Sequence, residues 1–189
     1  MVKEIPSTFD DRVDAIVTFV LDLAKEGERS AVVLGASRAD RALDELLKRF
    51  MLSHPGGSDN LFDPDRPLGT FSTKIAVAFR LGLIDRSCEH ALQMLRKIRN
   101  EFAHSTGHST LSESRHKSRV SELVFEAKRA GRWYDRMFAL LAKITARDLR
   151  AFCAASIVFI ALIDYAAEVI EPVKPSHTAS VDEAAASGS

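Results

Sequence analysis

A ten-residue stretch with helical periodicity decides the fold, and it reads Leu95-Arg96-Lys97-Ile98-Arg99-Asn100-Glu101-Phe102-Ala103-His104. At about 100° per residue, Leu95, Ile98 and Phe102 fall on one face of a helix, and this apolar face must meet a core. Asn100 and His104 lie one turn apart on nearly the opposite side. We therefore expect the polar group at the end of this helix to face solvent, a neighbouring loop or a partner subunit.

The same periodicity extends over most of the chain. Apolar residues recur at helical spacing, which predicts helices near residues 8–27, 30–50, 70–82, 85–104, 120–127 and 145–171. The residues expected to cap these helices are Thr8, Ser30, Thr70 or Ser72, Asp85 or Ser87, and Thr145. No segment shows sustained period-two alternation, so the sequence predicts an all-α, compact multi-helix bundle.

One loop and one tail interrupt the helical pattern. Proline, glycine and small polar residues over 53–67 predict a long loop, and loops of this length inside a compact domain are often functional. Pro172 forbids much continuation of the last helix, and the residues beyond Pro175 have no periodic apolar face. We expect residues 1–172 to form a single all-helical domain and residues 173–189 to be a disordered tail.

The bulk composition limits the class of protein. Twenty-six basic and 26 acidic residues cancel, so the chain lacks the overall positive charge of a general nucleic-acid binder. Its N-terminus has no long apolar segment typical of a signal peptide. The apolar run 151–163 is shorter than the ~20 residues that cross a bilayer, and we interpret it as a buried core helix rather than a membrane span. Cys88 and Cys153 fall in apolar helical patterns, which suggests reduced thiols in a cytoplasmic protein.

The most basic region of the chain lies between Arg115 and Arg136. We expect a polar stretch through Arg119 before the short helix at 120–127. The aromatic pair Trp133 and Tyr134 would either stack a base in a nucleic-acid interface or cover the core. Because acidic residues are interleaved with the cations, we favour a solvated face with a docking aromatic.

The other histidines do not indicate a metal centre. His54, His90, His108, His116 and His177 are scattered over expected loops and polar faces, without the spacing that assembles a metal site. The glycines at 56 and 57 lack the features of a phosphate-binding loop. We expect neither a metal nor a cofactor.

Three segments, in their order along the chain, resemble the mannitol operon repressor (MltR-like) family. They are residues 65–75, 81–84 and 96–104, and the whole resemblance covers roughly residues 10–170. It implies a compact all-α fold and a role in the transcriptional regulation of sugar-alcohol uptake. We find no helix-turn-helix pair around Ala142 to Arg150. The sequence therefore argues against direct sequence-specific DNA binding and favours action through a protein partner.

The string from Arg99 to His104 also resembles the Arg-x4-6-His motif of the HEPN superfamily, helical domains of which many are metal-independent ribonucleases. Asn100 supplies the polar residue that follows the arginine in this motif. The resemblance implies a homodimer in which two such helices face each other and form one composite cleft. RNA would then be the substrate.

The polar residues Arg99, Asn100 and His104 at the end of this helix allow two interpretations, one catalytic and one structural. In the first, His104 moves a proton at a ribose 2′-hydroxyl and Arg99 stabilises the charge on the phosphate. Asn100 would orient the histidine or the phosphate. In the second, His104 suits the negative end of the helix dipole, Arg99 pairs with Asp63, Asp65 or Glu101, and Asn100 bonds a loop carbonyl. We favour the second and rank a non-enzymatic regulator before a ribonuclease. The further binding residues that we predict are Arg96, Lys74, Phe71 and Asp65.

Overall fold

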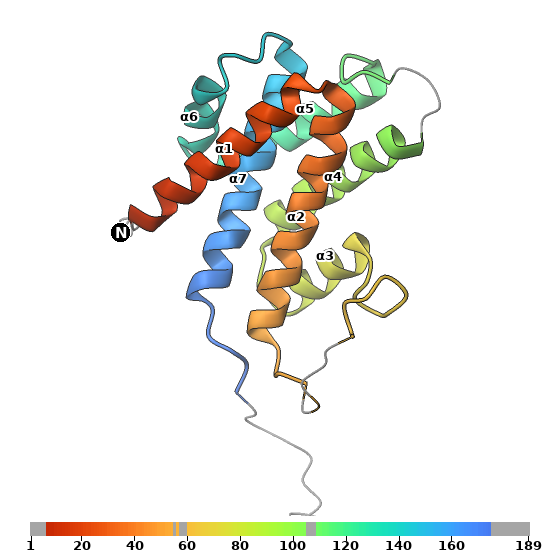
Figure 1. Cartoon of the computed structure of the whole chain (residues 1–189), viewed down its shortest axis with the longest axis vertical. Helices are drawn as coiled ribbons and strands as arrows, with labels where there is room; N and C mark the ends of the chain where they lie inside the picture. The colour runs from red at the N-terminus through yellow and green to blue at the C-terminus, as the bar shows by residue number, and fades with distance from the viewer. Residues whose placement is uncertain (1–6, 55, 57–59, 105–108, 175–189) are drawn as a thin grey trace, which may run out of the picture.

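The described part of the chain is entirely helical apart from its loops. The computed structural model (Figure 1) describes residues 7–54, 56, 60–104 and 109–174. Over these residues it has seven α-helices and no strand, which confirms the predicted all-α bundle. They are α1 (Ser7–Lys25), α2 (Glu28–Phe50), α3 (Phe71–Arg80), α4 (Arg86–His104), α5 (Ser114–Arg129), α6 (Trp133–Leu140) and α7 (Arg147–Val169).

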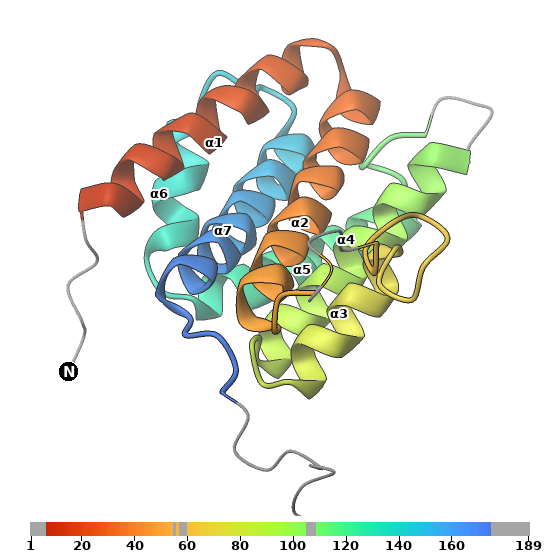
Figure 2. The same cartoon turned by 60° about the horizontal axis from the view of Figure 1, so that its bottom comes forward.

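The centre of the bundle is α7. It packs against α1, α2, α4, α5 and α6, and Figure 2 shows α2 beside it with α3 and α4 beyond α2. Among the described residues, α7 is the one helix long and apolar enough to cross a membrane, but most of its apolar window is buried inside the protein. A helix that is apolar on every side is stable in water only when other helices cover it. Residues 151–163 therefore belong to a buried core helix, as predicted.

The expected starts of the first two helices are wrong. The first helix begins at Ser7, so Thr8 lies inside it rather than at its cap. The second begins at Glu28, two residues before Ser30, and its N-cap position is Gly27 with a φ of 112°. A glycine is suited to this backbone conformation because it has no Cβ to clash. The sharp turn between α1 and α2 therefore determines which residue stands at the N-cap of α2, and no hydroxyl side chain caps this helix.

The starts of α3 and α4 agree with the sequence. The Thr70 side chain accepts a hydrogen bond from the Thr73 backbone N–H at 3.2 Å, as an N-cap residue does. Asp85 Oδ1 accepts from the Cys88 N–H at 2.8 Å. These contacts decide between the alternatives that the sequence left open, in favour of Thr70 over Ser72 and Asp85 over Ser87.

The region between α4 and α7 differs most from the prediction. The polar residues 115–119 belong to α5, which begins at Ser114 and not near residue 120. The aromatic pair at 133–134 begins α6, a helix that the apolar spacing did not predict. Tyr134 is buried and Trp133 packs against the core at its edge. The last helix begins at Arg147, with Ala146 rather than Thr145 at the N-cap.

The predicted long loop is present between α2 and α3. Its described residues fold back on themselves, with a hydrogen bond from the Leu68 N–H to the Leu61 carbonyl at 3.1 Å, and they bury Phe62 and Leu68. Where this loop begins, Val173 donates its N–H to the carbonyl of Phe50, the last residue of α2, at 2.7 Å. Val173 thus contacts the end of α2, and residues 175–189 of the predicted tail lie outside the described residues.

Candidate functional site

The second half of α4 has the two faces that its sequence predicts. Leu95 and Ile98 are fully buried and Phe102 nearly so, and all three belong to the main hydrophobic core. Asn100 is half-buried and His104 is exposed at the last residue of the helix. The polar end of α4 therefore points away from the core of its own subunit, which is what any role in binding or chemistry requires.

Hydrogen bonds along α4 hold two of the predicted site arginines. Arg96 donates from Nε to Gln93 Oε1 at 3.0 Å, and Gln93 donates in turn to Glu89 at 3.2 Å. Arg99 donates from Nη1 to Asn100 Oδ1 at 3.1 Å. Both arginines are half-buried. Arg99 thus contacts its neighbour Asn100, and within the described residues Asn100 bonds this side chain and not the loop carbonyl that the structural interpretation expected.

The expected ion pairs of Arg99 are not formed within the described part of the chain. Glu101, one of its three predicted partners, instead faces α5, where Arg119 donates a short charged hydrogen bond to it. Arg115 Nε lies 3.8 Å from the second oxygen of Glu101. The hydrogen bond from Arg119 lowers the pKa of Glu101, and the charges of Arg119, His116 and Arg115 add to this against the opposing effect of burial.

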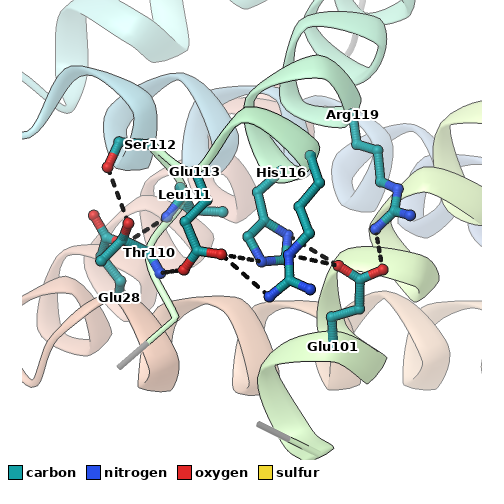
Figure 3. A network of polar contacts seen from close by, with 9 residues as sticks. Glu28, Glu101, Thr110, Leu111, Ser112, Glu113, His116 and Arg119 are labelled. Atoms are coloured by element: carbon teal, nitrogen blue, oxygen red, sulfur yellow. Dashed lines mark hydrogen bonds and ion pairs between the residues drawn. The ribbon is translucent and has the colours of Figure 1, made fainter. Parts of the chain in front are cut away.

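A buried histidine stands at the centre of this network, which Figure 3 shows between α4 and α5. His116 is fully buried, its Nδ1 lies 3.2 Å from Glu101 Oε2, and its Nε2 lies 3.9 Å from Glu113 Oε2. Its ring packs against Phe102 at 5.0 Å between centroids. Burial lowers the pKa of His116, although the two carboxylates oppose that shift. The sequence interpretation, which placed His116 on a loop or polar face, is therefore wrong.

The same network fixes the chain on both sides of residues 105–108. Glu113 accepts from the Thr110 N–H at 2.9 Å, and Glu28 at the start of α2 accepts from the Leu111 N–H at 2.8 Å. Arg29 donates to the Ala103 carbonyl at 3.1 Å, in the last turn of α4. The end of α4 and the start of α5 are therefore both held at the N-terminus of α2. These contacts lie directly beside His104.

Sequence reasoning missed this network because it placed the start of α5 too late. A usable signal was present, since His116 stands four residues before Val120 and seven before Leu123, both of which are buried. Extending the helical periodicity backward by one turn would have put His116 on the core face. The polar neighbours of His116 concealed this register.

The other predicted binding residues lie in different environments. Lys74 is buried, with Nζ 3.0 Å from both Asp40 and Asp44 of α2. Burial alone would lower the pKa of Lys74, but its hydrogen bonds and ion pairs with these two carboxylates outweigh this and raise it. Phe71 is half-buried against the core and Asp65 is exposed in the long loop. We assign Lys74 to the α2–α3 junction, and a binding role for Phe71 and Asp65 stays a prediction.

The described residues contain no group of three or more His, Cys, Asp or Glu side chains placed to hold a metal ion. His108 and His177 lie outside these residues. Cys88 and Cys153 are free and buried, and desolvation raises the pKa of each thiol to about 12. Neither thiol is therefore suited to act as a nucleophile.

Comparison with known proteins identifies a fold and no closer relationship. No family model and no curated protein sequence matches the chain. Among solved structures, a chain of the X-ray structure of the MtlR–HPr complex from Escherichia coli is similar, with a TM-score of 0.57 at 20% sequence identity. The match covers 79% of this chain and 99% of that chain. The protein therefore has an MtlR-like fold.

Proposed function

We propose that this protein is a helical regulator that acts by binding a protein partner, and that the partner is HPr or a protein like it. The observation that carries the proposal is the fold match, which spans nearly the whole of a chain from a complex between MtlR and HPr. The resemblance of residues 65–75, 81–84 and 96–104 to the mannitol operon repressor family supports the same conclusion from the sequence.

The arrangement of α5 and α6 also favours a protein partner over DNA. A three-residue turn containing Gly131 joins these helices, as in a helix-turn-helix. However, α6 has only eight residues, and it buries Tyr134 and Met137. Its exposed residues are Asp135, Arg136, Ala139 and Leu140, and the guanidinium of Arg136 lies over the Trp133 ring. A face with one cation, one acid and two apolar residues is poorly suited to a groove lined by phosphates. We expect no direct sequence-specific binding to an operator.

The proposal is tested by titrating HPr of the source organism into the purified full chain in a calorimeter. We expect a saturable complex with a dissociation constant of about 1 μM, or ~8 kcal/mol of binding free energy. A mobility-shift assay with operator DNA serves as the second arm. An absence of heat at high HPr concentration, together with a shift of the DNA, would overturn the proposal.

A metal-independent ribonuclease of the HEPN type is the second candidate function. The observation that favours it is the hydrogen bond from Arg99 to Asn100 on a helix that ends with an exposed His104. In this candidate, His104 transfers a proton at the 2′-hydroxyl or the leaving oxygen, and Arg99 stabilises the charge on the phosphate. A homodimer would place two copies of these residues across one cleft.

Cleavage of single-stranded RNA in the presence of EDTA tests this candidate. An active enzyme leaves cyclic-phosphate ends, and His104→Ala abolishes cleavage while the circular dichroism spectrum is unchanged. His54→Ala is the matched control, because His54 is an exposed histidine in the α2–α3 loop. Equal cleavage by wild type and His104→Ala would exclude the enzymatic role. Sedimentation of the same samples reports whether the chain is a dimer.

A further inference from the structure

The positive charge of this neutral protein is concentrated in one region. Residues 113–151 contain ten Lys and Arg against five Asp and Glu, whereas the charges of the whole chain cancel. This region includes α5, α6 and the start of α7, which pack against one another. The rest of the molecule therefore has a net negative charge, and the α5–α6–α7 region is where an acidic partner would be attracted.

A groove of about 650 Å³ lies between these three helices. Three exposed cations line it, two from α5 and one at the start of α7: Lys117, Lys128 and Arg147. Within the described part of the chain, none of the three forms an ion pair. By contrast, Arg115, Arg119 and Arg129, which share α5 with two of them, are paired with glutamates. The groove thus contains three cations of this region that no carboxylate neutralises within the described residues.

The start of α7 adds to this positive potential. Its N-cap position is Ala146, which provides no side-chain cap, so the first backbone N–H groups of a 23-residue helix keep their partial positive charge. Arg147, the first residue of α7, lines the groove at this point. An anionic group in the groove would meet the helix dipole as well as the three side chains.

The groove is better suited to a protein than to RNA. Its aromatic wall consists of Tyr134 and Phe138, which stack on each other at 5.9 Å. Lys128 lies over the Tyr134 ring at 5.5 Å, and the Arg150 guanidinium lies over the Phe138 ring at 4.0 Å. These faces are therefore not open to stack bases, which is the usual means of binding single-stranded nucleic acid.

Two carboxylates that line the groove also favour a protein over RNA as its occupant. Asp135 and Asp148 stand among the cations, where they would repel a continuous chain of phosphates. A mixed pattern of charges is typical of a protein interface, because it selects one partner and fixes its register. Val120, Val124 and Ala151 supply the apolar contact area between the charges.

We propose that the groove between α5, α6 and the start of α7 is the docking site for an acidic segment of the protein partner. Carboxylates of that segment would pair with Lys117, Lys128 and Arg147, and Asp135 and Asp148 would exclude segments of the wrong charge pattern. This inference rests on the proposed function, because it names the surface through which the regulator would bind its partner.

The first arm of the test uses charge reversal in the full chain. Lys117→Glu combined with Lys128→Glu should weaken HPr binding by about tenfold or more and should reduce its salt dependence. Lys143→Glu is the matched control, since Lys143 is an exposed cation of the same region that does not line the groove. If HPr binds the wild type and the double variant equally well, the groove is not the docking site, while the proposed function stands.

The second arm does not depend on HPr. A peptide in which glutamate alternates with alanine, and separately oligouridylate, are titrated into the ¹⁵N-labelled protein, and amide shifts are followed in NMR spectra. We expect the glutamate–alanine peptide to shift resonances of residues that line the groove in the wild type and not in the double variant. An absence of such shifts overturns the inference even where HPr fails to bind. Shifts with oligouridylate alone overturn it in favour of a nucleic-acid interface.

Discussion

His116 Nδ1 lies 3.2 Å from Glu101 Oε2, with the imidazole ring fully buried. Neither ring nitrogen has a well-directed hydrogen bond within the described residues, and the facing Glu101 oxygen also lacks one. Buried polar atoms of this kind usually cost stability unless a partner is supplied. The stability of the junction between α4 and α5 therefore depends on the protonation state of His116.

The first prediction concerns the pH dependence of stability. Because the pKa of His116 is lowered from 6.5 in the folded protein, the unfolded chain binds a proton more readily than the folded one as the pH falls. The contribution of His116 is present above pH ~6.5 and is lost as the pH falls from there through the lower folded pKa, with a slope of at most about 1.4 kcal/mol per pH unit. Urea unfolding between about pH 7 and pH 5 measures this loss.

The His116→Gln variant provides the comparison for this prediction. Glutamine keeps a polar side chain at the position but does not titrate, so the variant should lose less stability than wild type over the same pH interval. The other histidines contribute equally to both proteins. Because the charge of His116 lowers the pKa of Glu101 and of Glu113, the difference between the two proteins reports His116 together with these two neighbouring carboxylates. Identical slopes in the two proteins would show that His116 does not titrate differently on folding.

The second prediction concerns Glu101, which joins α4 to α5. Glu101→Gln removes the negative charge that Arg119, Arg115 and His116 face. We expect a loss of about 1–3 kcal/mol in the free energy of unfolding, as for a charged hydrogen bond that is partly buried. Glu45→Gln is the control, because the one ion pair that Glu45 forms among the described residues is an exposed pair with Arg41, and pairs of this kind contribute roughly 0–1 kcal/mol. Equal losses in the two variants would contradict this role for Glu101.

The main helices could be predicted from the sequence because they alternate strongly between apolar and polar faces. Leu95, Ile98 and Phe102 fall on the buried face of α4 as expected, and the run 151–163 is buried except at Ala151 and Leu162. The spacing of apolar residues predicts which face of a helix is buried, and this prediction succeeds where one face is clearly apolar. In the same way, Thr70 and Asp85 cap their helices through local hydrogen bonds that the sequence suggests.

The features that sequence reasoning missed depend on contacts between distant segments. Glu28 reaches the Leu111 N–H across 83 positions of sequence, and Lys74 reaches Asp40 and Asp44 on another helix. A lysine in an amphipathic pattern is normally exposed, and only the placement of α3 on α2 shows that Lys74 is buried. Among the candidate site residues, the orientation of Arg99 toward Asn100 also required the structure.

The third prediction tests the buried ion cluster at Lys74. Lys74→Met leaves Asp40 and Asp44 without their shared cation, and we expect a loss of about 3 kcal/mol in the free energy of unfolding. Lys48→Met is the control, since Lys48 pairs with Asp44 at 2.6 Å from a position that is nearly half exposed. We expect that variant to lose about 1 kcal/mol or less. A loss at Lys74 no larger than at Lys48 would contradict a structural role for its burial.

The fourth prediction contrasts two glycines that differ in the space around them. A Cβ added at Gly69 would lie 2.1 Å from the Asp63 carbonyl oxygen and 2.5 Å from the Pro64 carbonyl oxygen. Both obstacles are backbone atoms of the α2–α3 loop, so no side-chain rotation relieves the clash. Gly69→Ala should therefore lower the free energy of unfolding by about 1–3 kcal/mol, through displacement of the loop.

At Gly35 we expect the opposite effect of an alanine substitution on the free energy of unfolding. It lies inside α2, and a Cβ added there meets nothing within 4 Å. Alanine restricts the unfolded chain and favours the helix, so Gly35→Ala should raise the free energy of unfolding by about 0.5–1 kcal/mol. Urea unfolding of both variants measures the two effects. A loss of stability at Gly35, or none at Gly69, would show that the space around these two backbones differs from the structure described.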